Sequence, residues 1–110
     1  MNKQQFLLLK LAEECAEVAQ RASKQIQFGR DESQKDHAPT GAPVESKSNS
    51  ERLKEELLDL LSIWSMLEDV NEISKWTIEE AVESHDKKKI KLQKYLDLSY
   101  SLGQLPEIRL

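Results

Sequence analysis

Apolar residues recur at spacings of three and four residues in three separate segments of the chain. In the first segment, which includes Leu8 and Leu11, this spacing predicts a helix from about residue 2 to residue 27. A leucine-rich pattern of the same kind predicts a second helix over residues 49–68, and a third helix is expected to begin at residue 77. No stretch of useful length alternates as a strand would, so the pattern indicates an all-α protein.

The segments outside these helices have a different composition. Residues 29–50 are polar, hold two of the three prolines and show no periodicity, so we expect a loop that is either a mobile flap beside a site or an inert linker. Gly103 and Pro106 prevent another long helix near the end of the chain. We therefore expect a helical domain over residues 1–97, which contains the loop, and an irregular tail over residues 98–110.

Three helices in a chain of 110 residues bury little apolar surface, because a chain of this size hides only about 65% of its unfolded surface. We expect an antiparallel helical bundle that is completed by homo-oligomerisation, as a homodimer or a homotetramer. Cys15 lies on the apolar stripe of the first helix and is predicted to be a small core residue. As the single cysteine, it forms no disulfide within the chain.

The charge and the apolar runs of the chain argue against a nucleic-acid-binding protein and against a membrane-spanning one. Residues 51–86 contain eleven acidic residues, whereas residues 87–110 contain six basic ones. A nucleic-acid-binding protein would present a dominant basic face, so the acidic middle argues against nucleic acid as a partner. No apolar run approaches the ~20 residues that span a membrane, and the first residues do not resemble a signal peptide. We expect a cytoplasmic protein.

Two glutamates interrupt the apolar stripes. Glu14 has Leu11 before it and Val18 after it on the same face of the first helix. Glu56 occupies the equivalent place in the leucine stripe of the second helix, just before Leu60. A carboxylate that faces a helix interface is costly unless a cation meets it. The pattern therefore indicates a divalent-cation site between the two helices.

Each of these glutamates has a second carboxylate three residues further along, Glu17 and Asp59. Antiparallel packing would bring the four acids together in an all-oxygen site, which suits Mg²⁺ or Mn²⁺ rather than zinc or copper. Glu13 neighbours the site and is a candidate to orient or deprotonate a water molecule. Acid pairs at this spacing are also common on solvated helices, so a structural interpretation stays open.

The pattern Glu13-Glu14-x-x-Glu17 followed by Glu56-x-x-Asp59 resembles the signature of the all-α nucleoside triphosphate pyrophosphohydrolases, the MazG-like superfamily. The surrounding residues, 9–20 and 49–60, are similar to the short phage and bacterial members, and the resemblance covers about residues 5–96. The resemblance implies Mg²⁺-dependent cleavage of (d)NTP to (d)NMP and pyrophosphate, in nucleotide-pool house-cleaning. It also implies that Glu14, Glu17, Glu56 and Asp59 are the metal ligands and that Glu13 assists.

The residues that would bind the nucleotide are less strongly indicated by the sequence. Lys24 is a candidate for a phosphate contact or a solvated lysine, Arg52 for a phosphate contact or an ion pair with Glu56, and Asn49 for a substrate contact or a helix cap. On the third helix, Lys88, Lys91 and Lys94 share one face, and Tyr95 either stacks or packs. The candidates for substrate binding are thus Lys24, Asn49, Arg52, Lys91, Lys94 and Tyr95.

Two other functions are compatible with the sequence. A phosphoribosyl-ATP pyrophosphohydrolase would use the same carboxylates on a different substrate. A non-catalytic helical module for oligomerisation or as an adaptor would leave the acids solvated, and it predicts no stabilisation by Mg²⁺, whereas a metal enzyme gains stability from binding.

Overall fold

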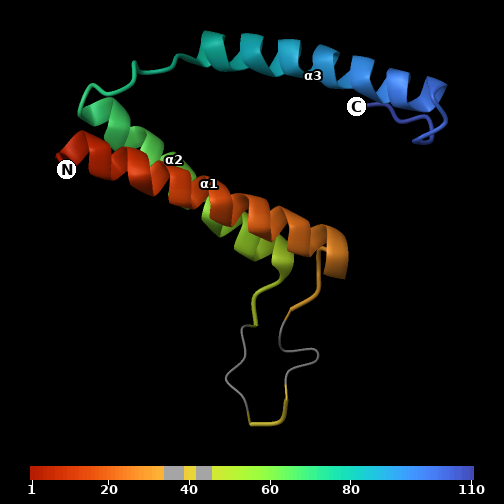
Figure 1. The fold of residues 1–110 in the computed structure, drawn as a ribbon, viewed down its shortest axis with the longest axis horizontal. Coiled ribbons are helices and arrows are strands. Elements are labelled where there is room, and N and C mark those ends of the chain that lie inside the picture. Colours follow the sequence, from red (N-terminus) through yellow and green to blue (C-terminus); the bar gives the residue numbers. More distant parts are fainter. Residues whose placement is uncertain (34–38, 42–45) are drawn as a thin grey trace. The chain divides into compact units, whose positions relative to one another are not determined.

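The computed structural model describes residues 1–33, 39–41 and 46–110. Within these ranges it contains three helices and no strand: α1 (Lys3–Phe28), α2 (Asn49–Asp69) and α3 (Ile78–Ser101) (Figure 1). The all-α prediction is therefore confirmed for the described residues. The chain divides into two compact units, Met1–Ser74 and Lys75–Leu110.

Helices α2 and α3 begin within one residue of the positions that the sequence predicts, and a capping side chain precedes each of them. The hydroxyl of Ser48 accepts a hydrogen bond from the backbone N–H of Glu51, at 3.2 Å. Thr77 and Glu80 form a capping box, in which each side chain accepts a hydrogen bond from the other's backbone N–H, at 3.1 and 3.3 Å. These bonds satisfy amides that the first turn of a helix leaves unpaired. Ser48, rather than Asn49, is thus the cap of α2.

The start of α1 and the ends of α1 and α2 are also determined by residues that lie at those positions in the sequence. Asn2 and Gln5 form a capping box at the start of α1, with hydrogen bonds of 2.8 and 2.9 Å. Gly29 ends α1 with a φ of 94°, a conformation that a residue with a Cβ atom rarely adopts. After α2, Asn71 adopts a left-handed φ of 59°, for which asparagine is well suited. Both helices therefore end within one residue of the predicted ends, residues 27 and 68.

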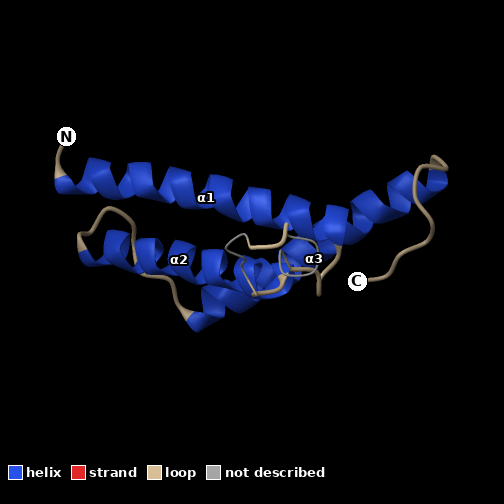
Figure 2. Ribbon diagram, turned by 90° about the horizontal axis from the view of Figure 1, so that it is seen from below, coloured by secondary structure: helices blue, strands red, loops and turns tan. Residues whose placement is uncertain are grey.

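Helices α1 and α2 pack against each other as an antiparallel hairpin (Figures 1 and 2). At its base, the backbone N–H groups of Asn49 and Ser50 donate hydrogen bonds to the carbonyl oxygens of Glu32 and Arg30, at 3.0 and 3.1 Å. These bonds fix the first turn of α2 to the segment that follows α1. The hairpin therefore has a defined register at the end where the chain reverses direction.

One line of residues on each helix is buried or half-buried between the two helices, and we call these two lines the seam. Successive seam residues alternate between spacings of four and three, as expected for two helices packed along their length. The seam consists of Leu7, Leu11, Glu14, Val18, Arg21 and Gln25 on α1, and of Asn49, Leu53, Glu56, Leu60, Ile63 and Leu67 on α2.

Few apolar side chains are fully shielded from water within one chain. Among the described residues, only Leu7 and Leu67 form a buried apolar core, whereas many large apolar side chains of all three helices are exposed. Cys15 is exposed, so the prediction that it is a core residue was wrong for the single chain. Cys15 follows Glu14 directly and lies beside the seam, and α2 shields only the seam itself.

The second unit consists of α3 and the residues after it. Helix α3 continues through Ser101, so the irregular segment starts later than expected. The side chain of Gln93 donates to the carbonyl oxygen of Ile108 and accepts from the backbone N–H of Leu110, at 2.9 and 3.0 Å. Arg109 also lies 3.7 Å from Asp97 of α3. The tail thus folds back along its own helix.

None of the helices in the described ranges combines the length and the apolar character that crossing a bilayer requires.

Candidate functional site

The hairpin brings carboxylates from both helices to one place in the seam. Glu14 of α1 and Glu56 and Asp59 of α2 each offer an oxygen atom, and these three atoms lie within 4.8 Å of one another. Glu14 and Glu56 are half-buried, whereas Asp59 is exposed at the edge. Three of the four carboxylates predicted as metal ligands therefore converge within the reach of a single cation.

Glu17, the fourth predicted ligand, belongs to the same electrostatic cluster. A hydrogen bond with Glu17 is the largest cause that raises the pKa of Glu56, followed by burial and by the negative charges of Glu17, Glu14 and Asp59. Burial raises the pKa of Glu14, and the charges of Glu17 and Asp59 raise it further. Because like charges crowd together here, the cluster favours any species that adds positive charge.

Each of the two seam glutamates has one carboxylate oxygen without a hydrogen-bond partner. Oε2 of Glu14 and Oε2 of Glu56 are buried, and neither accepts a hydrogen bond. A buried carboxylate oxygen without a donor is costly, and a divalent cation satisfies such an atom directly. The donor set is oxygen only, which is the chemistry that Mg²⁺ and Mn²⁺ prefer. The residues present therefore fit the cation that the sequence led us to expect.

Glu13 lies beside this cluster and is exposed. Its carboxylate forms an ion pair with Lys10, one turn earlier on α1, at 2.9 Å. This hydrogen bond and the charge of Glu13 raise the pKa of Lys10. Glu13 remains a candidate for assisting a water molecule, but it would have to exchange Lys10 for that water.

Asn49 is almost completely buried, and its side chain forms hydrogen bonds within the protein. Its amide nitrogen donates to the carbonyl oxygen of Gly29 at 2.8 Å and to Oε2 of Glu32 at 2.7 Å. Asn49 thus ties the start of α2 to the segment after α1. The contact of Asn49 with substrate stays a prediction. Because both hydrogen bonds use the amide nitrogen, the side-chain oxygen is the atom left to contact a substrate.

Lys24 and Arg52, the other two candidates on the hairpin, are half-buried. Arg52 lies one turn before Glu56 on α2, and these two described residues form no ion pair with each other. Arg52 was expected either to bind phosphate or to pair with Glu56, and the pair with Glu56 is absent. Phosphate binding by Lys24 and Arg52 stays a prediction.

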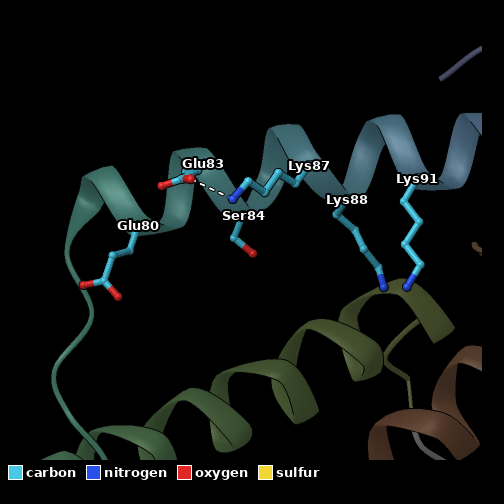
Figure 3. Close-up of a pocket in the computed structure, with 6 residues that line it drawn as sticks. All are labelled: Glu80, Glu83, Ser84, Lys87, Lys88 and Lys91. Atoms are coloured by element: carbon cyan, nitrogen blue, oxygen red, sulfur yellow. Dashed lines mark ion pairs between the residues drawn. The ribbon is translucent and has the colours of Figure 1, made fainter.

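The remaining candidates lie on α3, in the second unit. Lys88 and Lys91 extend toward the same side of the helix, where they line a pocket with Lys87, Ser84, Glu83 and Glu80 (Figure 3). The ammonium group of Lys91 lies 6.0 Å from the centre of the Tyr95 ring, within the range of a cation–π interaction. These contacts describe α3 by itself. The assignment of Lys91, Lys94 and Tyr95 to the substrate site stays a prediction.

Two polar residues of the seam were not among the predicted site residues. Nη1 of Arg21 and Oε1 of Gln25 are buried, and neither has a hydrogen-bond partner. Their spacing from Glu14 could have identified them, because Arg21 follows Glu14 by seven residues and therefore lies on the same helix face.

Comparisons of the sequence and structure with family models, curated proteins and solved structures gave no match.

Proposed function

We propose that this chain is a Mg²⁺-dependent nucleoside triphosphate pyrophosphohydrolase that converts (d)NTP to (d)NMP and pyrophosphate. One observation carries the proposal: acidic side chains from two antiparallel helices converge in the seam, and two of their oxygen atoms are buried without partners. The resemblance of the pattern Glu13-Glu14-x-x-Glu17 and Glu56-x-x-Asp59 to the MazG-like superfamily supplies the substrate class.

In this proposal, Glu14, Glu17, Glu56 and Asp59 hold the cation. When bound, Mg²⁺ supplies charge neutralisation of phosphate oxygens and a water molecule of lowered pKa. Glu13, at the exposed edge of the cluster, accepts the proton of the attacking water after its ion pair with Lys10 opens. Lys24, Arg52 and the α3 residues Lys91, Lys94 and Tyr95 serve as candidates for contacts with the nucleotide.

We further propose that the protein is a homodimer or homotetramer. Leu57 and Leu61 are spaced by one turn on α2, and both are exposed, as is Trp64 on the same face. This stripe lies beside the seam, so α1 does not cover it. A second copy of the chain would remove it from water, which is the usual reason for a large exposed apolar face.

The first experiment incubates the purified protein with Mg²⁺ and each common NTP and dNTP in turn, and separates the products. We expect a monophosphate and pyrophosphate from at least one nucleotide. Because Glu56 lies in the centre of the cluster, Glu56→Gln is expected to reduce the rate by at least about 100-fold, the scale of losing a group that stabilises developing charge. Glu79→Gln, an exposed change on α3, is the matched control.

The products distinguish this proposal from its alternatives. If phosphoribosyl-ATP is the one substrate that is hydrolysed, the proposed cleavage chemistry is correct and the proposed substrate is replaced. Release of inorganic phosphate instead of pyrophosphate would contradict the proposed bond. If no nucleotide is cleaved and Mg²⁺ does not raise the melting temperature, the adaptor function replaces the enzyme.

A further inference from the structure

Arg21 is a cation in a position that normally holds an apolar residue. It lies in the seam of α1, on the line that also contains Leu7, Glu14 and Val18, and it is half-buried. Its Nη1 atom is buried and donates to no acceptor. A guanidinium carries five N–H donors, and a buried donor without an acceptor is costly. The hairpin therefore leaves one buried donor of this charged group without an acceptor.

The position of Arg21 relative to the acidic cluster follows from helix geometry. Arg21 follows Glu17 by four residues and Glu14 by seven, so it lies on the same face, roughly 6 Å and 10 Å along the axis. Long helical side chains lean toward the N-terminus of their helix, so the turn that holds Glu17 is within reach of an arginine at position 21. An extended anion bound at the carboxylates through a cation would reach this group.

The neighbouring seam residues do not satisfy Arg21. Oε1 of Gln25, one turn further along α1, is an acceptor, yet it too is buried without a partner, so the two side chains do not pair. Asn49 lies seven residues before Glu56, which sets it level with Arg21 in the antiparallel hairpin. The amide nitrogen of Asn49 is itself a donor, to Gly29 and Glu32. The amide oxygen of Asn49 does not accept from Nη1 of Arg21, because that atom has no hydrogen-bond partner. The unpaired donor of Arg21 thus remains available to a ligand.

We propose that Arg21 binds a phosphate oxygen in the polyphosphate chain of the substrate, and so fixes that chain along α1 beside the carboxylates. This inference rests on the proposed pyrophosphohydrolase function. A planar guanidinium suits an oxyanion better than an ammonium group does, because it donates two parallel hydrogen bonds. Arg21 would therefore be a substrate-binding residue of the seam itself, in addition to the lysines on exposed surfaces.

The test uses inorganic tripolyphosphate, which has the phosphates of a nucleotide and no base. Its binding in the presence of Mg²⁺ is measured by calorimetry for the wild type, Arg21→Gln, Arg21→Lys and Arg30→Gln. Arg30 has a side chain that is 72% exposed, so Arg30→Gln makes the same chemical change outside the seam. We expect Arg21→Gln to weaken tripolyphosphate binding about 10- to 100-fold and to raise the KM for the nucleotide similarly.

The control measurements separate this role from a structural one. Arg30→Gln should bind like the wild type, and Arg21→Lys should be intermediate, because it keeps the charge and loses the second donor. Binding of Mg²⁺ alone should be unchanged in Arg21→Gln, which also verifies that this variant is folded. If Arg21→Gln does not fold, a tripolyphosphate affinity of Arg21→Lys equal to that of the wild type would overturn the inference.

The possible failures are distinguishable. If the wild type cleaves nucleotides and binds tripolyphosphate, and Arg21→Gln binds it equally well, the role of Arg21 is wrong and the proposed function stands. If the wild type neither cleaves any nucleotide nor binds tripolyphosphate, the proposed function fails, and the role of Arg21 fails with it.

Discussion

Glu14 and Glu56 occupy seam positions whose neighbours along the same lines are mostly apolar. Each is half-buried and each leaves one oxygen buried without a hydrogen bond. Two leucines at these half-buried positions would stabilise the hairpin, because apolar surface removed from water is favourable. The glutamates therefore weaken the packing of the free chain. The proposed cation site would explain why carboxylates are present there.

The raised pKa values of Glu14 and Glu56 predict how the stability of the metal-free protein depends on pH. In the folded chain these carboxyl groups hold protons at pH values at which the unfolded chain, with the ordinary pKa of 4.5, has released them. Their contribution to stability is therefore complete below pH 4.5 and is lost as the pH rises through the raised pKa of each group. We expect the melting temperature in EDTA to show this loss.

The Glu14→Gln/Glu56→Gln double variant isolates this effect from all other titrating groups. Since amides do not ionise, the double variant should melt at a higher temperature than the wild type near neutral pH and should lose less stability as the pH rises above 4.5. Thermal unfolding of both proteins across this range provides the measurement. Parallel profiles for the two proteins would contradict the assigned pKa shifts.

At the scale of residues, the sequence identifies the seam glutamates because a polar group interrupts an apolar pattern. Glu14 and Glu56 could be found in this way, because each has leucine or valine three and four residues away. Arg21 was overlooked, although it follows Glu14 by two helical turns, because a long cationic side chain usually extends to solvent. The exposure of Cys15 could not be predicted, since the width of the face that α2 covers depends on the packing of two helices.

At the scale of the elements, the three helices and their ends were predictable because their signals are local. Capping residues and apolar spacing lie within a few positions of the helix they define, as with Ser48 and Thr77. The connection of Asn49 to Gly29 and Glu32 was not predictable, because these partners lie 20 and 17 residues away in the chain. The sequence alone suggested a cap there.

The exposed stripe on α2 predicts where copies of the chain associate. Leu61→Glu places a charge in the middle of this stripe, between Leu57 and Trp64, and should shift the protein toward a 12.7 kDa monomer. Leu58→Glu is the matched control, because Leu58 is equally exposed but shares its face with Ser62 and Ser65. Sedimentation velocity gives the masses.

The wild type is expected to sediment as a dimer or tetramer, and Leu58→Glu should sediment like the wild type. A monomeric wild type would contradict the proposed oligomer. Dissociation by Leu58→Glu, without any effect of Leu61→Glu, would place the interface on another face of α2.

At the scale of the whole molecule, the hairpin and the α3 unit contribute different groups. The hairpin contains Glu14, Glu56 and Asp59, whose oxygen atoms lie within 4.8 Å of one another, so the proposed cation site consists of residues of the first unit. Two basic residues of α3 have partners on the same helix: Lys87 pairs with Glu83 at 2.8 Å, and Lys91 lies near the ring of Tyr95. The seam carboxylates could be predicted from the periodicity of the sequence. Substrate contacts by α3 residues could not, because a pattern along one helix carries no information about residues of another unit.

Calorimetric titration of Mg²⁺ or Mn²⁺ into the metal-free protein tests the cation site most directly. The wild type and Glu79→Gln should show saturable binding, and Glu56→Gln should show none, although it folds at least as well as the wild type because a repulsive charge is removed. Absence of saturable binding to the wild type, or equal binding to Glu56→Gln, would contradict the assignment of the seam carboxylates as a metal site.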